Sequence, residues 1–176
     1  MVDWFTPDDL RGAAGARQSG DQSRFDLAAS VARREVRRLC GPVFPVETIT
    51  ERRIRGGSYE LPLKFRPTAL TSVARYFNGL AYTVGDYDFD EQVLVRKDGG
   101  WIGDDLAVVY DTGYDTVEEI PSELISMATL IGQQYLRVSK RFSLEGEDAM
   151  TGTGYLVPDA ARDVGRDYLL APGGMG

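Results

Sequence analysis

The sequence predicts an α+β protein in which two long helices flank an antiparallel β-module. Three observations carry this prediction: a helical repeat of apolar residues over residues 24–40, a second one over residues 121–140, and short β-rich runs separated by glycine turns over residues 43–112. The chain has 176 residues and is 43% hydrophobic, enough for one domain with added segments. We expect a small helical bundle, with short terminal helices, an inserted β-module and an extended C-terminal tail.

The first long helix follows a polar, flexible segment, residues 1–23. Within that segment, Thr6-Pro7 followed by two acids is typical of a helix start, so a short helix is expected there. In residues 24–40 the apolar side chains recur every three or four positions. Gly41-Pro42 is expected to end this helix, because glycine accepts the left-handed cap conformation and proline cannot continue the helix.

The β-module, residues 43–112, contains several hairpin signals. Gly56-Gly57 and Asn78-Gly79 each stand between β-rich runs. Asn78-Gly79 is the strongest signal for a two-residue turn, so a strand over residues 69–77 should pair directly with one over residues 80–84. The aromatic residues of the module are expected in its core, the alternative being a stacking platform for single-stranded nucleic acid. These aromatic residues are Tyr76, Phe77, Tyr82, Tyr87, Phe89 and Trp101.

The second long helix, residues 121–140, begins with a proline and an acid and ends near cations, as the helix dipole prefers. It completes a core region that spans residues 24–142. Residues 143–176 are expected to form the extended tail, with one short helix inside residues 158–170. Several apolar tail residues have no evident partner within the domain, which makes them candidates for docking on another protein. They are Tyr155, Leu156, Val157, Val164, Tyr168, Leu169 and Leu170.

The composition argues against several classes of protein. The chain has no histidine, which excludes Ser-His-Asp and Cys-His catalytic arrangements and histidine-based zinc sites. Its single cysteine, Cys40, cannot form an intrachain disulfide and is expected to be a small buried hydrophobe. No apolar run approaches the roughly 20 residues that span a bilayer, and the first residues lack the basic segment of a signal peptide. We therefore expect no enzyme, no cofactor, no metal and no membrane partner, in a protein made in the cytoplasm.

The formal net charge is −7, so the chain should repel DNA phosphates at long range. Residues 86–91 resemble the start of a calcium loop, but Glu91 and Lys97 stand where such a loop needs a glycine and a glutamate. We expect a solvated acidic loop there, and a simple turn at Asp104-Asp105 in preference to a general acid–base pair. The candidate acidic surface residues are Asp86, Asp88, Asp90, Glu91, Asp104 and Asp105.

Four arginines form a basic stripe on the first long helix. One interpretation is a surface that makes forked contacts with phosphate or with an acidic partner, and another copy of this acidic chain would be a natural one. The other is a solvated helix face with ion pairs through Glu35. Both interpretations stay open from the sequence. The residues concerned are Arg33, Arg34, Arg37 and Arg38.

Three segments carry a resemblance to a known family. The first is the helix Phe25 to Leu39 that ends in Cys40-Gly41. The second is Leu-Pro-Leu at residues 61–63 with Arg-Pro-Thr-Ala-Leu-Thr-Ser-Val at residues 66–73. The third is Val-Val-Tyr-Asp-Thr-Gly-Tyr at residues 108–114, followed by Ile-Pro-Ser-Glu-Leu at residues 120–124. In this order and spacing, over residues 21–140, they resemble the head–tail connector (adaptor) proteins of long-tailed phages.

The resemblance implies a virion neck protein that works by assembly. It implies a ring of about twelve copies that docks under the portal protein, extends the DNA channel and meets a stopper or tail-completion protein. Genomic DNA would pass through without sequence recognition. Within such a ring we expect the arginine stripe between subunits, the tail on the portal or a neighbouring subunit, and the acids at the channel or lower face. The alternatives are another neck protein (a stopper or tail terminator, which is more purely β) and a DNA-binding accessory protein.

Overall fold

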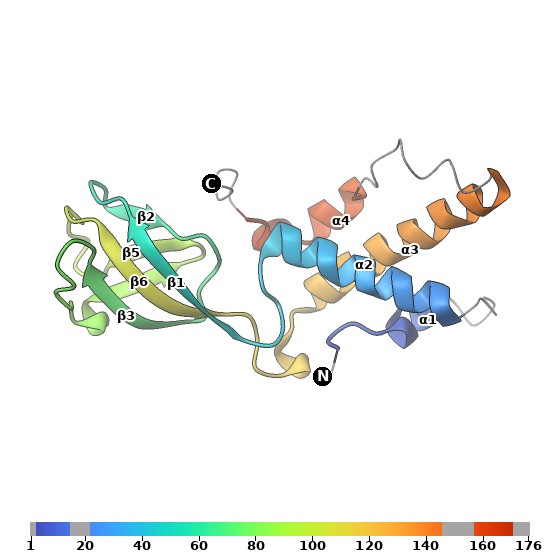
Figure 1. Ribbon diagram of the computed structural model, residues 1–176, viewed down its shortest axis with the longest axis horizontal. Helices are drawn as coiled ribbons and strands as arrows, with labels where there is room; N and C mark the ends of the chain where they lie inside the picture. Colours follow the sequence, from blue (N-terminus) through green and yellow to red (C-terminus); the bar gives the residue numbers. More distant parts are fainter. Residues whose placement is uncertain (1–2, 15–21, 146–156, 171–176) are drawn as a thin grey trace. The chain divides into compact units, whose positions relative to one another are not determined.

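A computed structural model describes residues 3–14, 22–145 and 157–170, and it confirms the α+β class (Figure 1). The described residues divide into two compact units. The helical unit combines residues up to 39 with residues 120–169, and the β-unit is Cys40–Glu119. Both long helices therefore belong to one unit, although the whole β-unit lies between them in the sequence.

The helical unit contains four α-helices, each close to where the sequence predicts one. They are α1 (Pro7–Ala14), α2 (Gln22–Cys40), α3 (Ser122–Glu145) and α4 (Asp159–Val164). The predicted helix at residues 121–140 extends further, to Glu145. A short 3-10 turn, Arg166–Tyr168, follows α4.

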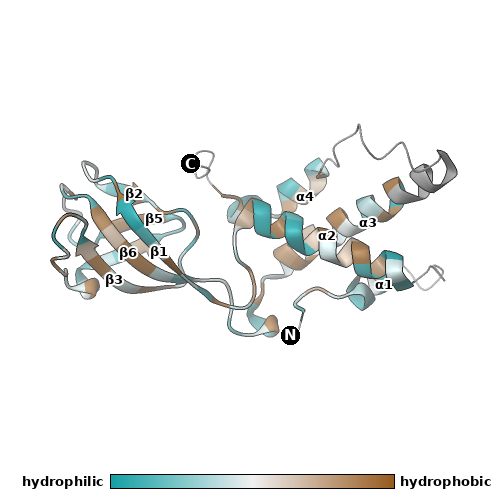
Figure 2. Ribbon diagram, in the orientation of Figure 1, coloured by the Kyte–Doolittle hydropathy of each residue, from teal (hydrophilic) through white to brown (hydrophobic). Residues whose placement is uncertain are grey.

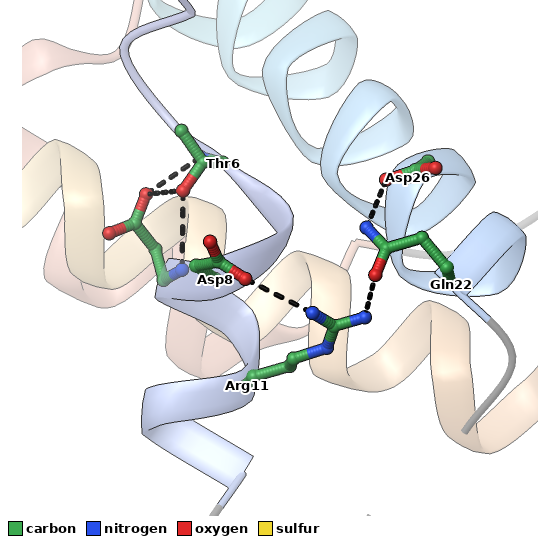
Figure 3. Close-up of polar contacts among 6 residues, drawn as sticks. Thr6, Asp8, Arg11, Gln22 and Asp26 are labelled. Atoms are coloured by element: carbon green, nitrogen blue, oxygen red, sulfur yellow. Dashed lines mark hydrogen bonds and ion pairs between the residues drawn. The ribbon is translucent and has the colours of Figure 1, made fainter. Parts of the chain in front are cut away.

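The start of α1 is fixed by a reciprocal cap, the pattern that Thr6 predicts. The backbone N–H of Thr6 donates to the Asp9 carboxylate at 2.7 Å, and the N–H of Asp9 donates to the Thr6 hydroxyl at 3.3 Å (Figure 3). Arg11 then links α1 to α2, because its guanidinium donates to Gln22 and lies 5.0 Å from the ring centroid of Phe25. These contacts tie the short helix to the start of α2.

The core of the helical unit is built from one apolar stripe on each long helix. In α2 the buried stripe runs from Phe25 to Val36, and Figure 2 shows mostly hydrophilic residues toward the C-terminal end of the helix. Gly132 of α3 leaves room for Leu10 of α1, since a Cβ there would lie 2.6 Å from a Leu10 methyl carbon. The buried residues of the two stripes are Phe25, Ala28, Ala29, Val31, Ala32, Val36, Leu124, Met127, Ala128, Ile131 and Leu136.

The β-unit consists of two three-stranded antiparallel sheets. The strand orders are β1-β6-β3 and β2-β5-β4. The strands are β1 (Glu47–Ile54), β2 (Glu60–Pro62), β3 (Ala69–Arg75), β4 (Tyr87–Asp90), β5 (Val93–Arg96) and β6 (Leu106–Thr112). The apolar residues of the two sheets form one buried cluster, in which Leu94, Leu106, Val108 and Tyr110 are fully buried. The predicted run of hairpins within residues 43–112 is thus a small β-unit with its own core.

The hairpin at Asn78-Gly79 differs from the expected two-residue turn. The backbone N–H of Arg75 donates to the carbonyl of Leu80 at 2.8 Å, and Gly79, with a φ of +67°, closes the loop onto Arg75. The loop therefore contains the four residues 76–79, and the strand ends two residues earlier than predicted. As a result, Tyr76 and Phe77 lie in the loop and leave the sheet.

Candidate interaction surfaces

The arginine stripe of α2 divides into one internal contact and an exposed group. The Arg33 side chain is 24% exposed, pairs with Asp3 and donates to the backbone carbonyl of Phe5 at 3.1 Å. It therefore holds the N-terminal segment, in which Trp4 and Phe5 are buried, against α2. This contact lies inside the helical unit, so Arg33 has a structural role that the sequence did not reveal.

Arg34 and Arg38 flank the partly buried Glu35 on α2. Arg38 lies 2.8 Å from its carboxylate and Arg34 lies 3.7 Å from it, and both arginine side chains stay more than half exposed. These are the ion pairs expected if the stripe is a solvated helix face. Exposed pairs of this kind contribute little to stability. Arg37 is also exposed. Leu27, seven residues before Arg34 and therefore on the same side of the helix, is 52% exposed.

Asp104 and Asp105 do more than form a turn. Asp104 accepts hydrogen bonds from the Tyr82 hydroxyl at 2.5 Å and from Arg75 at 2.7 Å. Asp105 accepts from the N–H of Gly56 at 3.0 Å and from Arg53 at 2.9 Å. The two aspartates thus connect the ends of β1 and β3 to the start of β6, all at one end of the sheet.

The partners of the two aspartates lower both pKa values. The hydrogen bond from Tyr82, followed by that from Arg75, holds the pKa of Asp104 below its usual value. The N–H of Gly56, followed by Arg53, does the same for Asp105. Both carboxylates are therefore charged and matched by arginines of the same unit. This distinguishes them from the other candidate acids.

Two of the remaining acids lie on an edge strand and two lie beside it, whereas the sequence placed all four in a loop. Asp88 and Asp90 belong to β4, the outer strand of its sheet, where they are exposed and alternate with Tyr87 and Phe89. Glu91 follows in the turn with a φ of +51°. Asp86 precedes the strand, at the end of the 3-10 turn Val84–Asp86, and is exposed. Charged side chains on an edge strand prevent uncontrolled strand pairing.

The apolar tail residues differ in burial, although the sequence analysis expected all of them to lack a partner within the domain. Val157 is 5% exposed and Ala161 is fully buried, because α4 packs against α3. At Gly165 a Cβ would lie 2.5 Å from the sulfur of Met127 in α3. The prediction that the apolar tail lacks a partner within the domain is therefore wrong for Val157. Val164 is 39% exposed, Tyr168, Leu169 and Leu170 are half-buried, and Tyr155 and Leu156 lie outside the described residues.

Several aromatic residues expected in the β-core are exposed. Tyr87 is buried, but Tyr76 is 41%, Phe77 73% and Trp101 53% exposed, so the prediction of a core position is wrong for these three. The loop described above explains the first two. Two further exposed apolar residues, Tyr59 and Leu80, lie close to them in the fold, and no sequence pattern pointed to either. Trp101 packs edge-on against Tyr59 at 5.1 Å between ring centroids.

The described residues offer no metal site made of three or more histidine, cysteine, aspartate or glutamate side chains. Burial raises the pKa of the Cys40 thiol to about 12, so this cysteine is a poor nucleophile. Within the described part of the chain, the helices lack the combination of length and apolar character needed to cross a membrane.

The comparisons with known proteins bear on the fold alone. No protein-family model and no curated protein matches the chain. A solved structure does, the "Neck of empty GTA particle computed with C6 symmetry", GTA denoting a gene transfer agent. This chain shares its fold with a chain of a particle neck. The TM-score is 0.54 at 10% sequence identity, and the match covers 98% of this chain and 93% of the neck chain.

Proposed function

We propose that this protein is a structural subunit of the neck of a phage-like particle, where it forms a ring between the portal protein and the tail. The observation that carries the proposal is the fold match to a particle-neck chain over 98% of this chain and 93% of the other. A match of that extent includes the helical unit and the β-unit together. A single common supersecondary motif cannot produce it.

The surface composition supports an assembly role. Clusters of exposed aromatic side chains mark interaction sites more often than isolated exposed residues do. Here the aromatic pairs Tyr76–Phe77 and Tyr59–Trp101 are both exposed at one end of the β-unit. The exposed arginines of α2 and the exposed part of the tail, around Val164, add further candidate contacts with neighbouring copies or with the portal.

The charge of the chain suits a channel for DNA. A formal net charge of −7 per copy, multiplied around a ring, would give a negative potential that lets DNA pass without adhering. Asp104 and Asp105 would add little to this potential, because arginines of the same unit match their charges. The neck that this chain resembles in fold was computed with C6 symmetry. Rings of six copies, or of a multiple such as about twelve, are compatible with that symmetry.

Electron microscopy of particles assembled with this chain tests the proposal. The expected result is density for the chain as a closed ring between portal and tail, in contact with the portal. Location in a ring further from the portal would instead assign it the role of stopper or tail terminator. Absence from the neck would refute the proposal.

A binding measurement separates the ring protein from a DNA-binding accessory protein. We expect weak binding to duplex DNA, because the chain is acidic and Arg33 and Arg38 already have carboxylate partners. Fluorescence anisotropy with labelled duplex over a range of salt concentrations measures this. Tight binding that weakens steeply with salt would favour the DNA-binding alternative.

A further inference from the structure

We propose that an aromatic and basic patch at one end of the β-unit binds a second copy of this chain through the acidic edge strand β4 of that copy. The tip patch is defined by Arg53, Arg55, Tyr76, Phe77 and Leu80. The inference rests on the proposed ring and deepens it, since it assigns the two surfaces by which neighbouring subunits would meet.

The centre of the tip patch is held rigid before any partner arrives. The Arg53 guanidinium lies 5.5 Å from the ring centroid of Tyr76 and 5.6 Å from that of Phe77. The two rings pack edge-on at 5.2 Å. Asp105 fixes the other side of Arg53 through a hydrogen bond of 2.9 Å. A preorganised patch loses little side-chain entropy on binding, which favours association.

The patch exposes apolar surface that the β-unit does not use. Phe77 is 73% and Leu80 is 55% exposed, and neither belongs to the buried cluster of the β-unit. Four-residue hairpin loops are ordinarily polar, and this one places two aromatic rings outside the sheet. Aromatic residues and arginine are the types enriched at the centres of protein interfaces, where few residues supply most of the binding energy.

A protein partner fits the patch better than a nucleic acid. Arg53 is already engaged by Asp105 and by two aromatic faces, and the nearby Arg75 is engaged by Asp104. A nucleic acid would bring a continuous run of phosphates to a chain of formal net charge −7, which repels it at long range. Arg55 is exposed and adds positive charge at this end. A partner surface with exposed carboxylates would complement it.

The C-terminal end of the edge strand β4 presents such a surface, at the other end of the same unit. The strand register shows this, because Asp90 and Pro62 both pair with Val93, while the bridge between Ser58 and Ile102 lies toward the tip patch. Asp90 and Glu91 are exposed at that end, and Asp88 is exposed further along the strand. The two surfaces cannot meet within one β-unit, but they can meet between copies. Such head-to-tail contacts close into a ring when the rotation between copies allows it.

Sedimentation velocity of the full-length protein over a series of concentrations tests the inference. Phe77→Ser should weaken self-association about tenfold or more, as expected for an aromatic residue at an interface centre. Arg55→Glu and Asp90→Arg should each weaken it several-fold. The double variant Arg55→Glu/Asp90→Arg should recover association, because every contact then carries the reversed charge pair.

Two matched controls show whether the effect is specific. Asp115→Arg and Glu118→Arg each reverse an exposed acid of the β-unit away from β4. Both should associate like the wild type. All the substituted side chains are exposed, so the variants should fold, and circular dichroism verifies this.

Several results would overturn the inference. One is a Phe77→Ser protein that associates like the wild type, and another is a double variant that fails to recover association. Binding of single-stranded DNA that Phe77→Ser abolishes would assign the patch to nucleic acid instead. A wild-type protein that stays monomeric at its highest soluble concentration would also refute it. The neck proposal would survive each of these results, because the position of the chain in particle density is measured independently.

Discussion

The hydroxyl group of Tyr110 donates a hydrogen bond of 2.5 Å to the carboxylate of Glu51 in the neighbouring strand. It also accepts one of 3.1 Å from the backbone N–H of Phe65. The same Glu51 oxygen accepts from the N–H of Lys64 at 2.7 Å. Tyr110 is fully buried, and burial followed by the hydrogen bond to Glu51 raises its pKa well above the usual range. This network joins β1 and the segment after β2 to the central strand β6.

Replacement of Tyr110 by phenylalanine should destabilise the β-unit by about 1–3 kcal/mol, because the N–H of Phe65 loses its acceptor and Glu51 loses one of its two donors. Urea denaturation followed by circular dichroism measures the free energy of unfolding. Thr48→Val is the matched control, since its hydroxyl donates to Asp111 at an exposed site, and it should cost no more than about 0.5 kcal/mol. Equal effects from the two variants would contradict this account.

Replacement of Gly132 by alanine should loosen α1, because the new Cβ would lie 2.6 Å from a methyl carbon of the fully buried Leu10. Overpacking of this kind costs about 1–3 kcal/mol, partly offset by the roughly 1 kcal/mol that alanine gains over glycine in a helix. Hydrogen exchange should show faster exchange of the α1 amides. Gly12→Ala, which meets nothing within 4 Å, should slow that exchange instead. Unchanged exchange in Gly132→Ala would refute the close contact.

Arg33 and Arg34 should respond differently to the same substitution. Arg33→Met keeps the apolar stem but removes the donor to Phe5 and the partner of Asp3, so a loss of about 1.5–3 kcal/mol is expected. Arg34→Met removes only an exposed ion pair and should change stability by less than about 0.5 kcal/mol. Fluorescence of Trp4 during urea denaturation, in a Trp101→Phe background, measures both. Similar losses would mean that Arg33 does not hold the N-terminal segment.

The low pKa of Asp104 predicts how stability depends on pH. Because Tyr82 and Arg75 stabilise the charged form in the folded state, the unfolded chain binds the proton more readily. The contribution of Asp104 is therefore present above the unfolded pKa of aspartate, about 3.9, and is lost as pH falls through the lower folded value. Asp104→Asn should be less stable than the wild type at neutral pH, and the difference should shrink in acid. A difference in urea midpoint that is constant with pH would contradict this.

The hairpin after β3 shows where prediction from sequence ends. Asn78-Gly79 located the turn correctly, because local backbone preferences depend on neighbouring residues alone. The loop length depends on how far β3 pairs with the β6 segment, and that contact reaches Tyr76, whose N–H donates to the carbonyl of Asp105 at 2.8 Å. This contact joins residues almost thirty positions apart in the sequence. The tip patch that results could not be found from periodicity.

For the charged candidate residues, too, the sequence indicated the positions, whereas only the folded chain established the contacts. The sequence located the arginine stripe on one helix, since helical spacing fixes which side chains share a face. Only the folded chain shows that Arg33 binds the N-terminal segment, while Arg34 and Arg38 remain on the surface. Likewise, adjacent residues Asp104 and Asp105 looked like a turn until the folded chain brought arginines from β1 and β3 to them.

The sequence by itself determined the α+β class, the position of each long helix and the glycine turns of the β-unit, because these follow from local propensity and apolar periodicity. The tertiary structure decided the rest. It packed α4 on α3, so Val157 is covered within the chain, and it placed the tip patch and the acidic strand β4 at different ends of one unit. These outcomes depend on contacts between residues distant in sequence, for which one sequence alone carries no local signal.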